Sequence, residues 1–378
     1  MKQAADTVWI VEQAKTAGFD LCGVVRAEAF PELENTAEWL ARGYAGEMKY
    51  LHDPRREDLS MAMPGVRSVI VCALGYNTGY PLSTEEEFSG KEGEPRGWVS
   101  RYGWGDDYHD VLLERLEALI ARMRERFVEP FEAHAYVDTG PIQERVAAKY
   151  AGLGWLGKNT LLLSQTIGSY FFLGVILTTL ELQPTLGAEE MPAPDLCGSC
   201  TRCLDACPTQ AFVEPYVMDA RKCISYLTIE LRGSIPEELR EPMGHHVFGC
   251  DICQDVCPWN RRALVSTLAQ FQPRTLASCN VGESTACVDA QNESLFRPRL
   301  ETLLSLNEED FRELFRGSPL KRTKRRGLLR NACIAAGNSK LAPGSPSHSR
   351  ICECLRKLAA CGDSILEESA QWALSRIQ

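Results

Sequence analysis

The sequence predicts an α+β fold, followed by a cysteine-rich segment and a helical C-terminal region. Three observations support this prediction. Strand-length apolar runs and amphipathic segments mix over residues 1–185 without a regular βαβ repeat. Cysteines gather between residues 197 and 257, and paired helical patterns fill the chain from residue 297 onward. We therefore expect a layered α+β domain over 1–185, a cysteine-rich domain over 186–262, and an α-solenoid-like helical region over 295–378.

Hydrophobic periodicity and the positions of Gly and Pro predict the individual elements. In the first domain we expect helices over 6–17, 30–42 and 108–127, and strands over 21–25, 66–74, 131–137 and 170–180. A further helix is expected to begin at Gly140-Pro141, with proline at its first position, and to end near 152–154. Residues 78–95 are expected to form a surface loop and 183–194 a linker, and the C-terminal helices are expected over 306–315, 327–336, 351–360 and 364–377.

The cysteine spacing predicts two [4Fe–4S] clusters. Residues 197–208 follow the C-x2-C-x2-C-x3-C-P pattern of bacterial two-cluster ferredoxins, in which the fourth cysteine ligates the other cluster. Residues 250–258 repeat the pattern with one cysteine missing, and Cys223 can replace it. A four-cysteine zinc site has no use for the third cysteine of the run, and disulfides need an oxidising compartment. We expect one cluster on Cys197, Cys200, Cys203 and Cys257, and the other on Cys207, Cys223, Cys250 and Cys253.

Composition narrows the class of protein. The 378 residues carry a net charge of −10, which argues against nucleic-acid binding over the whole surface. No secretory signal is recognisable in residues 1–18, and the longest apolar stretch, 170–177, is too short to span a bilayer. We therefore expect a cytoplasmic protein. The eight other cysteines show no metal-ligand spacing and are expected to be reduced thiols: Cys22, Cys72, Cys279, Cys287, Cys333, Cys352, Cys354 and Cys361.

One segment of the acidic chain is basic. No acidic residue lies between Glu313 and Glu353. Lysine and arginine at this density are suited to phosphate contacts, although a solvated helix face would look the same. The candidate nucleic-acid-binding residues are Arg322, Lys324, Arg325, Arg326 and Arg330.

Asp138 is the candidate catalytic residue. It follows the apolar residues Tyr136 and Val137 at the end of a predicted strand. A carboxyl group in an apolar cavity has a raised pKa and can carry a proton at neutral pH, whereas the alternative is an N-cap aspartate. The glycine-rich stretches 100–109 and 152–159 could line a large flat cofactor or form tight turns. Neither matches a dinucleotide-binding or P-loop motif.

Five motifs together resemble one family. They lie at 100–109 (Ser-Arg-Tyr-Gly-Trp-Gly-Asp-Asp-Tyr-His), 137–141 (Val-Asp-Thr-Gly-Pro), 207–209 (Cys-Pro-Thr), 221–228 (Arg-Lys-Cys-Ile-Ser-Tyr-Leu-Thr) and 249–260 (Gly-Cys-Asp-Ile-Cys-Gln-Asp-Val-Cys-Pro-Trp-Asn). With these motifs the chain resembles the epoxyqueuosine reductases, cobalamin-dependent enzymes of queuosine biosynthesis in tRNA. Residues 278–294, with Cys279 and Cys287, do not fit the family pattern.

The resemblance implies a cofactor arrangement. Cobalamin would bind base-off between the α+β domain and the clusters, with no histidine ligand because no D-x-H-x-x-G motif is present. It implies an N-terminal fold similar to that of reductive dehalogenases and a HEAT-like C-terminal region. Asp138 would be the proton donor. The expected contacts to the corrin ring are Arg56, Ser100, Asp138, Lys158, Ser225 and Asp251.

The implied reaction reduces epoxyqueuosine to queuosine in the tRNA anticodon loop and consumes two electrons and two protons. The expected partners are tRNA carrying epoxyqueuosine and an external flavodoxin or ferredoxin, and the expected state is a monomer. One alternative is a cobalamin-dependent reductive dehalogenase, which the missing export signal and the basic segment disfavour. The other is a non-catalytic iron–sulfur electron carrier, which would have no need of the large α+β domain.

Overall fold

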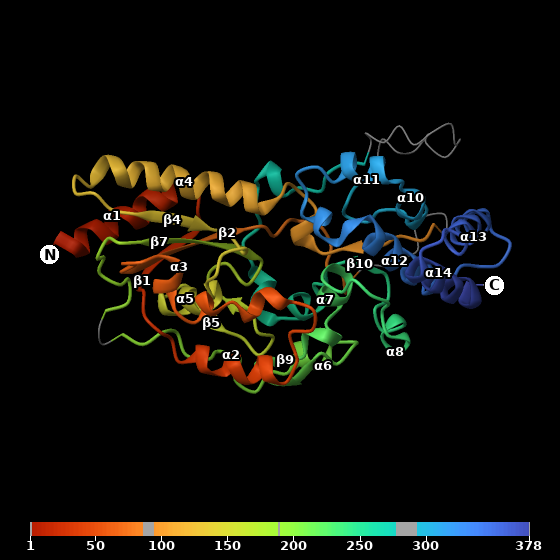
Figure 1. The fold of residues 1–378 in the computed structure, drawn as a ribbon, viewed down its shortest axis with the longest axis horizontal. Coiled ribbons are helices and arrows are strands. Elements are labelled where there is room, and N and C mark those ends of the chain that lie inside the picture. Colours follow the sequence, from red (N-terminus) through yellow and green to blue (C-terminus); the bar gives the residue numbers. More distant parts are fainter. Residues whose placement is uncertain (1, 86–93, 188–189, 277–292, 378) are drawn as a thin grey trace.

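The protein has a mixed α+β structure, as predicted. The computed structural model describes residues 2–85, 94–187, 190–276 and 293–377. In Figure 1 the N-terminal sheet lies at one end of the long axis and the C-terminal helices at the other, with the cysteine-rich segment between them. This arrangement places the cysteine-rich segment against both other parts of the chain.

An antiparallel sheet forms the N-terminal part. Its strand order is β1-β2-β7-β4. All eight residues of β2 are buried, because β2 is covered by helices on both faces. The strands are β1 (Leu21–Arg26), β2 (Ser68–Gly75), β4 (Ala133–Tyr136) and β7 (Phe171–Thr178), close to the predicted strands.

Successive side chains of the sheet pack alternately into two hydrophobic cores, one on each face. Ile70, Cys72 and Leu74 pack with α1 (Lys2–Thr16) and α4 (Tyr108–Arg126) on one face. Val69, Val71 and Ala73 pack with α5 (Glu144–Tyr150) on the other, as the period of two along a strand requires. Figure 1 shows α1 and α4 above the sheet and α5 below it. The predicted periodicity of α4 is confirmed, since one face of the helix is buried: Val111, Leu112, Leu116, Leu119, Ile120 and Met123.

Short elements make up the rest of the first part. Helix α2 (Glu32–Ala41) matches its prediction, and α3 (Leu59–Ala62), β3 (Trp98–Val99), β5 (Trp155–Leu156) and β6 (Leu162–Leu163) were not predicted. The 3-10 helices here are η1 (Lys49–His52), η2 (Pro54–Arg56) and η3 (Arg101–Gly103).

The cysteine-rich segment is built from elements too short to give a periodic signal. They are α6 (Arg202–Asp205), β8 (Phe212–Glu214), β9 (Val217–Met218), η4 (Ala220–Lys222), α7 (Ile224–Ile229), α8 (Glu237–Arg240), β10 (His246–Phe248), α9 (Ile252–Asp255), η5 (Pro258–Arg262) and η6 (Ala269–Phe271).

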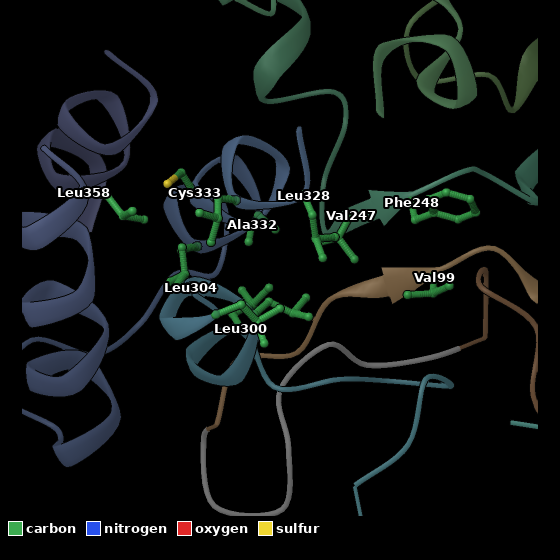
Figure 2. Close-up of a cluster of buried hydrophobic side chains, with 14 of the residues drawn as sticks. Val99, Val247, Phe248, Leu300, Leu304, Leu328, Ala332, Cys333 and Leu358 are labelled. Atoms are coloured by element: carbon green, nitrogen blue, oxygen red, sulfur yellow. The ribbon is translucent and has the colours of Figure 1, made fainter. Parts of the chain in front are cut away.

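The C-terminal helices share a core with residues far away in the sequence. Strand β10 pairs in parallel with β3, and Val99, Val247 and Phe248 join the cluster that contains Leu300 and Leu328 (Figure 2). The packing therefore crosses the expected domain boundaries at 185 and 262. The α-helices are α10 (Leu300–Ser305), α11 (Glu308–Leu314), α12 (Lys324–Gly337), α13 (Pro346–Leu358) and α14 (Ser364–Ile377). The 3-10 helix η8 (Pro319–Thr323) precedes α12, and α10 was not predicted.

One prediction about local structure was wrong. The helix expected to begin at Gly140-Pro141 begins at Glu144, with Gln143 as its N-cap. The guanidinium of Arg56 donates to the carbonyls of Gly140 and Ile142, at 3.1 Å each, and holds this stretch as a loop. The described part of the 78–95 loop is mostly exposed over residues 78–85, as predicted, although Thr78 and Ser83 are buried within it. Residues 86–93 and most of 278–294, with Cys279 and Cys287, lie outside the described residues.

No helix in the described part of the chain combines the length and apolar character needed to cross a bilayer.

Candidate active site

A cavity of about 1870 Å³ opens between the sheet, the cysteine-rich segment and the basic segment. Its walls include Phe172 of β7, Trp39 of α2, Tyr226 of α7 and Arg322 of η8. Drug-sized ligands fill pockets of roughly 300–1,000 Å³, so this cavity has room for a larger group. The side chains of both glycine-rich stretches line it, among them Tyr102 and Asn159.

The glycines of these stretches serve packing between parts of the chain. A Cβ on Gly105 would lie 2.0 Å from the carbonyl oxygen of Gln270. A Cβ on Gly154 would lie 1.9 Å from that of Leu163. These close approaches support the tight-turn interpretation for the glycines, while their neighbours face the cavity.

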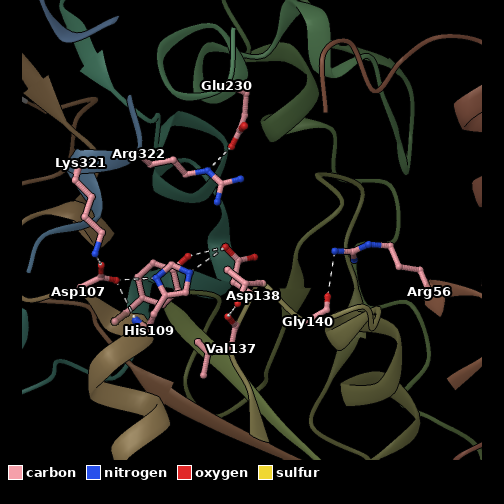
Figure 3. Close-up of polar contacts among 11 residues, drawn as sticks. Arg56, Asp107, His109, Val137, Asp138, Gly140, Glu230, Lys321 and Arg322 are labelled. Carbon is pink, nitrogen blue, oxygen red and sulfur yellow. Dashed lines mark hydrogen bonds and ion pairs between the residues drawn. The ribbon is translucent and has the colours of Figure 1, made fainter. Parts of the chain in front are cut away.

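Asp138 lies on the cavity wall at the end of β4. Its backbone has φ of 57°, a left-handed conformation that is strained for a non-glycine residue and is typical of functional sites. The phenol of Tyr108 donates to its Oδ2 at 2.7 Å, and the ring of Tyr108 is stacked on Phe172. The carboxylate faces the cavity, so 59% of its side chain is accessible although the walls surround it. Figure 3 shows Asp138 beside His109.

His109 connects Asp138 to a second carboxylate. Its Nδ1 lies 2.7 Å from Oδ1 of Asp107, and its Nε2 lies 3.7 Å from Oδ2 of Asp138. Asp107 is the N-cap of α4 and also pairs with Lys321 at 2.7 Å, so its position is fixed from two sides. Burial opposes a charge on the His109 ring, but the two carboxylates outweigh it and raise its pKa to about 9. His109 is therefore a cation at neutral pH.

The prediction of a raised pKa for Asp138 was wrong. Burial does raise it, as expected, but the ion pair with His109, the hydrogen bond from Tyr108 and the charge of Arg322 outweigh burial and lower the pKa to about 2. The N-cap alternative was also wrong, because Gln143 occupies that position. At neutral pH without substrate, His109 therefore carries the proton, and Asp138 is an ionised carboxylate next to it that can accept that proton.

Arg322 brings a positive charge from the basic segment into the cavity. Its Nε donates to Glu230 at 2.6 Å, and its guanidinium lies 5.6 Å from the centre of the Tyr50 ring. Figure 3 shows it on the side of the site opposite Arg56, with Asp138 between them. Arg322 thus offers a cation to any anionic group that enters the cavity.

The eight cysteines predicted as cluster ligands are all free thiols, four in each predicted group. Burial and the charges of Cys257, Cys197 and Cys200 raise the pKa of Cys203 to about 11. Burial and the charges of neighbouring thiols also raise the pKa of Cys253, and among those thiols Cys223 has the largest influence. The members of the second group all line the cavity: Cys207, Cys223, Cys250 and Cys253.

Neither group has the geometry of a single-ion site. Within the described ranges no three Cys, His, Asp or Glu side chains converge closely enough to hold one metal ion. Eight thiols, four of which line the cavity, match the number of ligands that two cubane clusters need.

The structure separates the residues predicted to contact the corrin ring. Arg56, Ser100, Asp138 and Ser225 line the cavity. Lys158 does not, because its ammonium donates to the carbonyls of Gly198 and Cys200.

Asp251 is not a cavity residue either. It is 1% exposed and accepts hydrogen bonds from Ser100 and from the backbone of Arg101. Lys158 and Asp251 therefore hold neighbouring parts of the chain in place and do not line the cavity, in contrast to their predicted role as corrin contacts.

The basic segment divides in the same way. Arg322, Lys324 and Arg325 line the cavity, and Arg326 is exposed at its rim. Arg330 is 1% exposed and donates to the carbonyls of Leu227, Leu231 and Gly233. A buried guanidinium cannot reach a phosphate, so we remove Arg330 from the candidate nucleic-acid surface.

Sequence reasoning missed three residues of the site. Tyr108 and His109 belong to the noted stretch 100–109, but nothing local assigns them to Asp138. Glu144 lies six residues after Asp138 on the same wall. Glu144 follows Pro141-Ile142-Gln143, and nothing in this local sequence assigns it to the site.

The fold and site define a class of protein: an iron–sulfur oxidoreductase with a large substrate cavity and built-in acid–base groups. A family model for a 4Fe-4S double cluster binding domain matches residues 196–260, and the model for epoxyqueuosine reductase QueG, DUF1730, matches residues 56–139. An epoxyqueuosine reductase of Gloeobacter violaceus is 44% identical over 340 residues, covering 87% of this chain and 95% of the relative. The chain belongs to the epoxyqueuosine reductase family and is an oxidoreductase.

Solved structures agree with this membership. An epoxyqueuosine reductase in complex with an epoxyqueuosine-modified tRNA-Tyr stem loop superposes with a TM-score of 0.82 at 28% identity, over 99% of this chain and 90% of that one. A Bacillus subtilis epoxyqueuosine reductase, whose catalytic aspartate loop is swung out of the active site, gives a TM-score of 0.81 at 28% identity with the same coverage.

Proposed function

We propose that this chain reduces epoxyqueuosine on tRNA to queuosine, and that the reaction takes place in the cavity beside Asp138. The observation that supports this most is the content of that one cavity. It holds an acid–base chain, four thiols of one cluster group, and cations of the basic segment. A reduction that consumes electrons and protons needs the first two, and an anionic nucleic-acid substrate needs the third.

The cavity residues fit cobalamin as the group that meets the substrate. The volume suits a corrin ring, and its walls are largely aromatic or apolar, with Trp39, Tyr102, Phe172 and Tyr226 among them. His109, the only histidine among the described residues lining the cavity, is held by Asp107, which agrees with base-off binding without a histidine ligand. When bound, cobalamin supplies a cobalt centre that is a strong reductant and nucleophile. Arg56, Ser100 and Ser225 are the proposed polar contacts to it.

The two thiol groups are proposed to hold the two clusters in the order of electron flow. The cluster on Cys207, Cys223, Cys250 and Cys253 is proposed to face the cavity, because all four line it. The cluster on Cys197, Cys200, Cys203 and Cys257 is proposed to take electrons from outside. Its donor is a low-potential carrier such as a flavodoxin or ferredoxin, since cysteine-ligated clusters work down to roughly −700 mV.

Asp138 is proposed to hand protons to the epoxide oxygen. An epoxide is a poor electrophile until its oxygen is protonated, and general acid catalysis contributes on the order of 10²–10⁴ in rate. His109 is proposed to reload Asp138, because it holds a proton at neutral pH next to the ionised carboxylate. The relative from Bacillus subtilis supports a catalytic role for an aspartate on a movable loop.

The basic residues at the cavity rim are proposed to bind the tRNA backbone. Lys324 and Arg326 are exposed, and Arg322 and Arg325 lie beside them on the cavity wall. A relative of similar fold has been solved with a modified tRNA stem loop, which supports the same kind of partner here. We propose that helices α10–α14 form a HEAT-like region that carries this surface, that the protein acts as a monomer, and that a tRNA substrate places it in the cytoplasm.

Asp138→Asn tests the proposed site. The variant keeps the shape of the side chain but cannot carry a proton, so turnover is expected to fall on the order of 10²–10⁴-fold. Iron content and cobalamin uptake, read from the absorption spectrum, are expected to stay at the wild-type level. Turnover within a factor of two of wild type, with both cofactors bound, would remove Asp138 from the proton-donor role.

A further inference from the structure

Glu144 is a buried carboxyl group that the proposed mechanism does not use. It is the first residue of α5 and lines the same cavity as Asp138. Its Oε1 is sealed from solvent and has no hydrogen-bond partner among the described residues. Within the described residues, the only hydrogen bond to an ionised carboxylate there would come from its own backbone N–H, which lowers the pKa, while Oε1 would lose its hydration with nothing in return, so the geometry favours the neutral acid.

The charges around Glu144 come from three elements. Burial is the largest influence and raises its pKa, and the negative charge of Asp138 raises it further. Arg56 of η2 and Arg145 of α5 act in the opposite direction. The guanidinium of Arg56 is already engaged with the carbonyls of Gly140 and Ile142, and within the described part of the chain it makes no ion pair with Glu144. The net pKa is about 8, so Glu144 holds a proton at neutral pH.

The reaction needs two protons within one turnover. Two C–O bonds of the epoxide break, one C=C bond gains its second pair, and two O–H bonds form to release water. The two electrons come from the external low-potential donor through the clusters. His109 can supply one proton through Asp138 without help from solvent, and a second proton must come from another group once substrate fills the cavity.

We infer that Glu144 is the second proton source of this active site, and that it delivers its proton to the departing oxygen through Asp138. Both acids are carried by one stretch, residues 138–144, which Arg56 clamps in the middle. The charges of the two side chains already influence each other. Glu144 thus recharges Asp138 from one side while His109 recharges it from the other. The inference rests on the proposed role of this cavity as the reaction site.

Two simpler roles predict different results. If Glu144 only favoured the N-terminus of α5, its replacement would change stability and leave the pH dependence of the rate alone. If it only accepted a hydrogen bond from an amide of bound cobalamin, its replacement would weaken cofactor uptake with the same pH dependence. A proton source is the one role that moves the pH profile.

The experiment compares Glu144→Gln and Glu144→Asp with the wild-type holoenzyme. The enzyme is reduced, mixed with epoxyqueuosine tRNA, and single-turnover rates are measured from about pH 6 to about pH 10. A group that donates a proton supports the rate below its pKa, so the wild-type rate is expected to fall as the pH rises through about 8. In Glu144→Gln the rate at neutral pH is expected to drop on the order of 10²-fold and the fall near pH 8 to disappear, which leaves only the later fall that His109 sets near pH 9. Glu144→Asp is expected to restore that fall.

Glu32→Gln is the matched control. Glu32 lines the same cavity, but it pairs with Lys149 of α5 and the balance of burial and that pairing lowers its pKa, so it is ionised throughout this pH range. Its replacement is expected to leave the fall near pH 8 in place.

A Glu144→Gln enzyme that keeps the wild-type fall near pH 8 overturns the inference, whether its rate or its cobalamin uptake changes or not. The proposed site itself is judged separately by Asp138→Asn. If Asp138→Asn is inactive and Glu144→Gln keeps the wild-type profile, the site stands and only the role of Glu144 is wrong.

Discussion

At the scale of single residues, the acid–base behaviour of the site comes from paired groups rather than from one carboxyl group in an apolar pocket. Asp107 holds His109 by a 2.7 Å contact, His109 keeps Asp138 ionised, and Tyr108 fixes the Asp138 oxygen. The left-handed backbone at Asp138 stores strain on the order of 1–3 kcal/mol, which the Tyr108 hydrogen bond and the Arg56 clamp help to offset. The proton is therefore held by His109 until substrate arrives.

Asp107→Asn tests this chain at the residue scale. The carboxylates raise the pKa of His109 above its ordinary value, so the ring stays protonated to higher pH than a free histidine. Without the Asp107 charge the pKa of His109 is expected to fall, and the ring to lose its proton nearer neutral pH. Turnover of the variant is then expected to decline already at neutral pH, where the wild type keeps its rate. Asp110→Asn, an exposed carboxylate of the same helix, serves as the control with an unchanged profile.

An unchanged pH–rate profile in Asp107→Asn would contradict the account of His109 as the stored proton.

At the scale of elements, one basic segment performs two different tasks. Lys324 and Arg326 point outward at the start of α12, whereas Arg330, on the buried face of the same helix, donates to carbonyls of the cysteine-rich segment. Asn331 continues this contact by donating to the carbonyls of Thr228 and Val247. Helix α12 therefore ties the proposed tRNA surface rigidly to the segment that carries the cluster thiols.

A double charge reversal tests the outward face of α12. Lys324→Glu with Arg326→Glu is expected to weaken binding of an epoxyqueuosine tRNA stem loop and to flatten the dependence of log Kd on log salt by about one to two units, because each phosphate contact contributes about one unit. The measurement is a binding titration at several salt concentrations. Arg124→Glu with Lys357→Glu, two exposed cations on α4 and α13, is the matched control and is expected to bind like wild type.

An equal loss of affinity in both double variants would mean that net charge, and not this surface, decides binding.

The elements also show what the sequence could and could not predict. The strands of the sheet and α4 followed from periodicity, because burial there alternates regularly along the chain. The start of α5 did not, because the stretch before it is held as a loop by Arg56. The guanidinium of Arg56 donates to the carbonyl of Gly140, which lies 84 residues away in the sequence. The double cluster domain followed from cysteine spacing, and the assignment of its ligands stays a prediction. Tyr108 lies 30 residues from Asp138, and no local pattern brings them together.

At the scale of the whole molecule, the chain encloses one cavity with three different walls. The sheet provides Asp138 and Phe172, the cysteine-rich segment provides one group of thiols, and the basic segment provides Arg322. These walls are joined by packing that crosses the expected domain boundaries, through β3, β10 and the core in Figure 2. One of the two predicted thiol groups lines the cavity, and we propose that electrons reach the cavity through it from the other group.

Single cysteine replacements test this arrangement. Cys253→Ala, in the cavity group, and Cys200→Ala, in the outer group, are each expected to lose about four of about eight irons, because each removes a ligand of a different [4Fe–4S] cluster. Both are expected to lose turnover with the external electron donor. Cys361→Ser, an exposed thiol of the C-terminal region, is expected to keep all iron. Full iron content in either cluster variant would contradict the assignment of that ligand.

The most direct test of the central claim is the reaction itself. The protein is reconstituted anaerobically with iron, sulfide and cobalamin, reduced with a low-potential donor, and given tRNA that carries epoxyqueuosine. The tRNA is then digested, and the mass of the modified nucleoside is measured by mass spectrometry. We expect the loss of one oxygen atom from that nucleoside, only when cobalamin is present and not with Asp138→Asn. Unchanged epoxyqueuosine with both clusters and cobalamin bound would contradict the claim that this cavity reduces it.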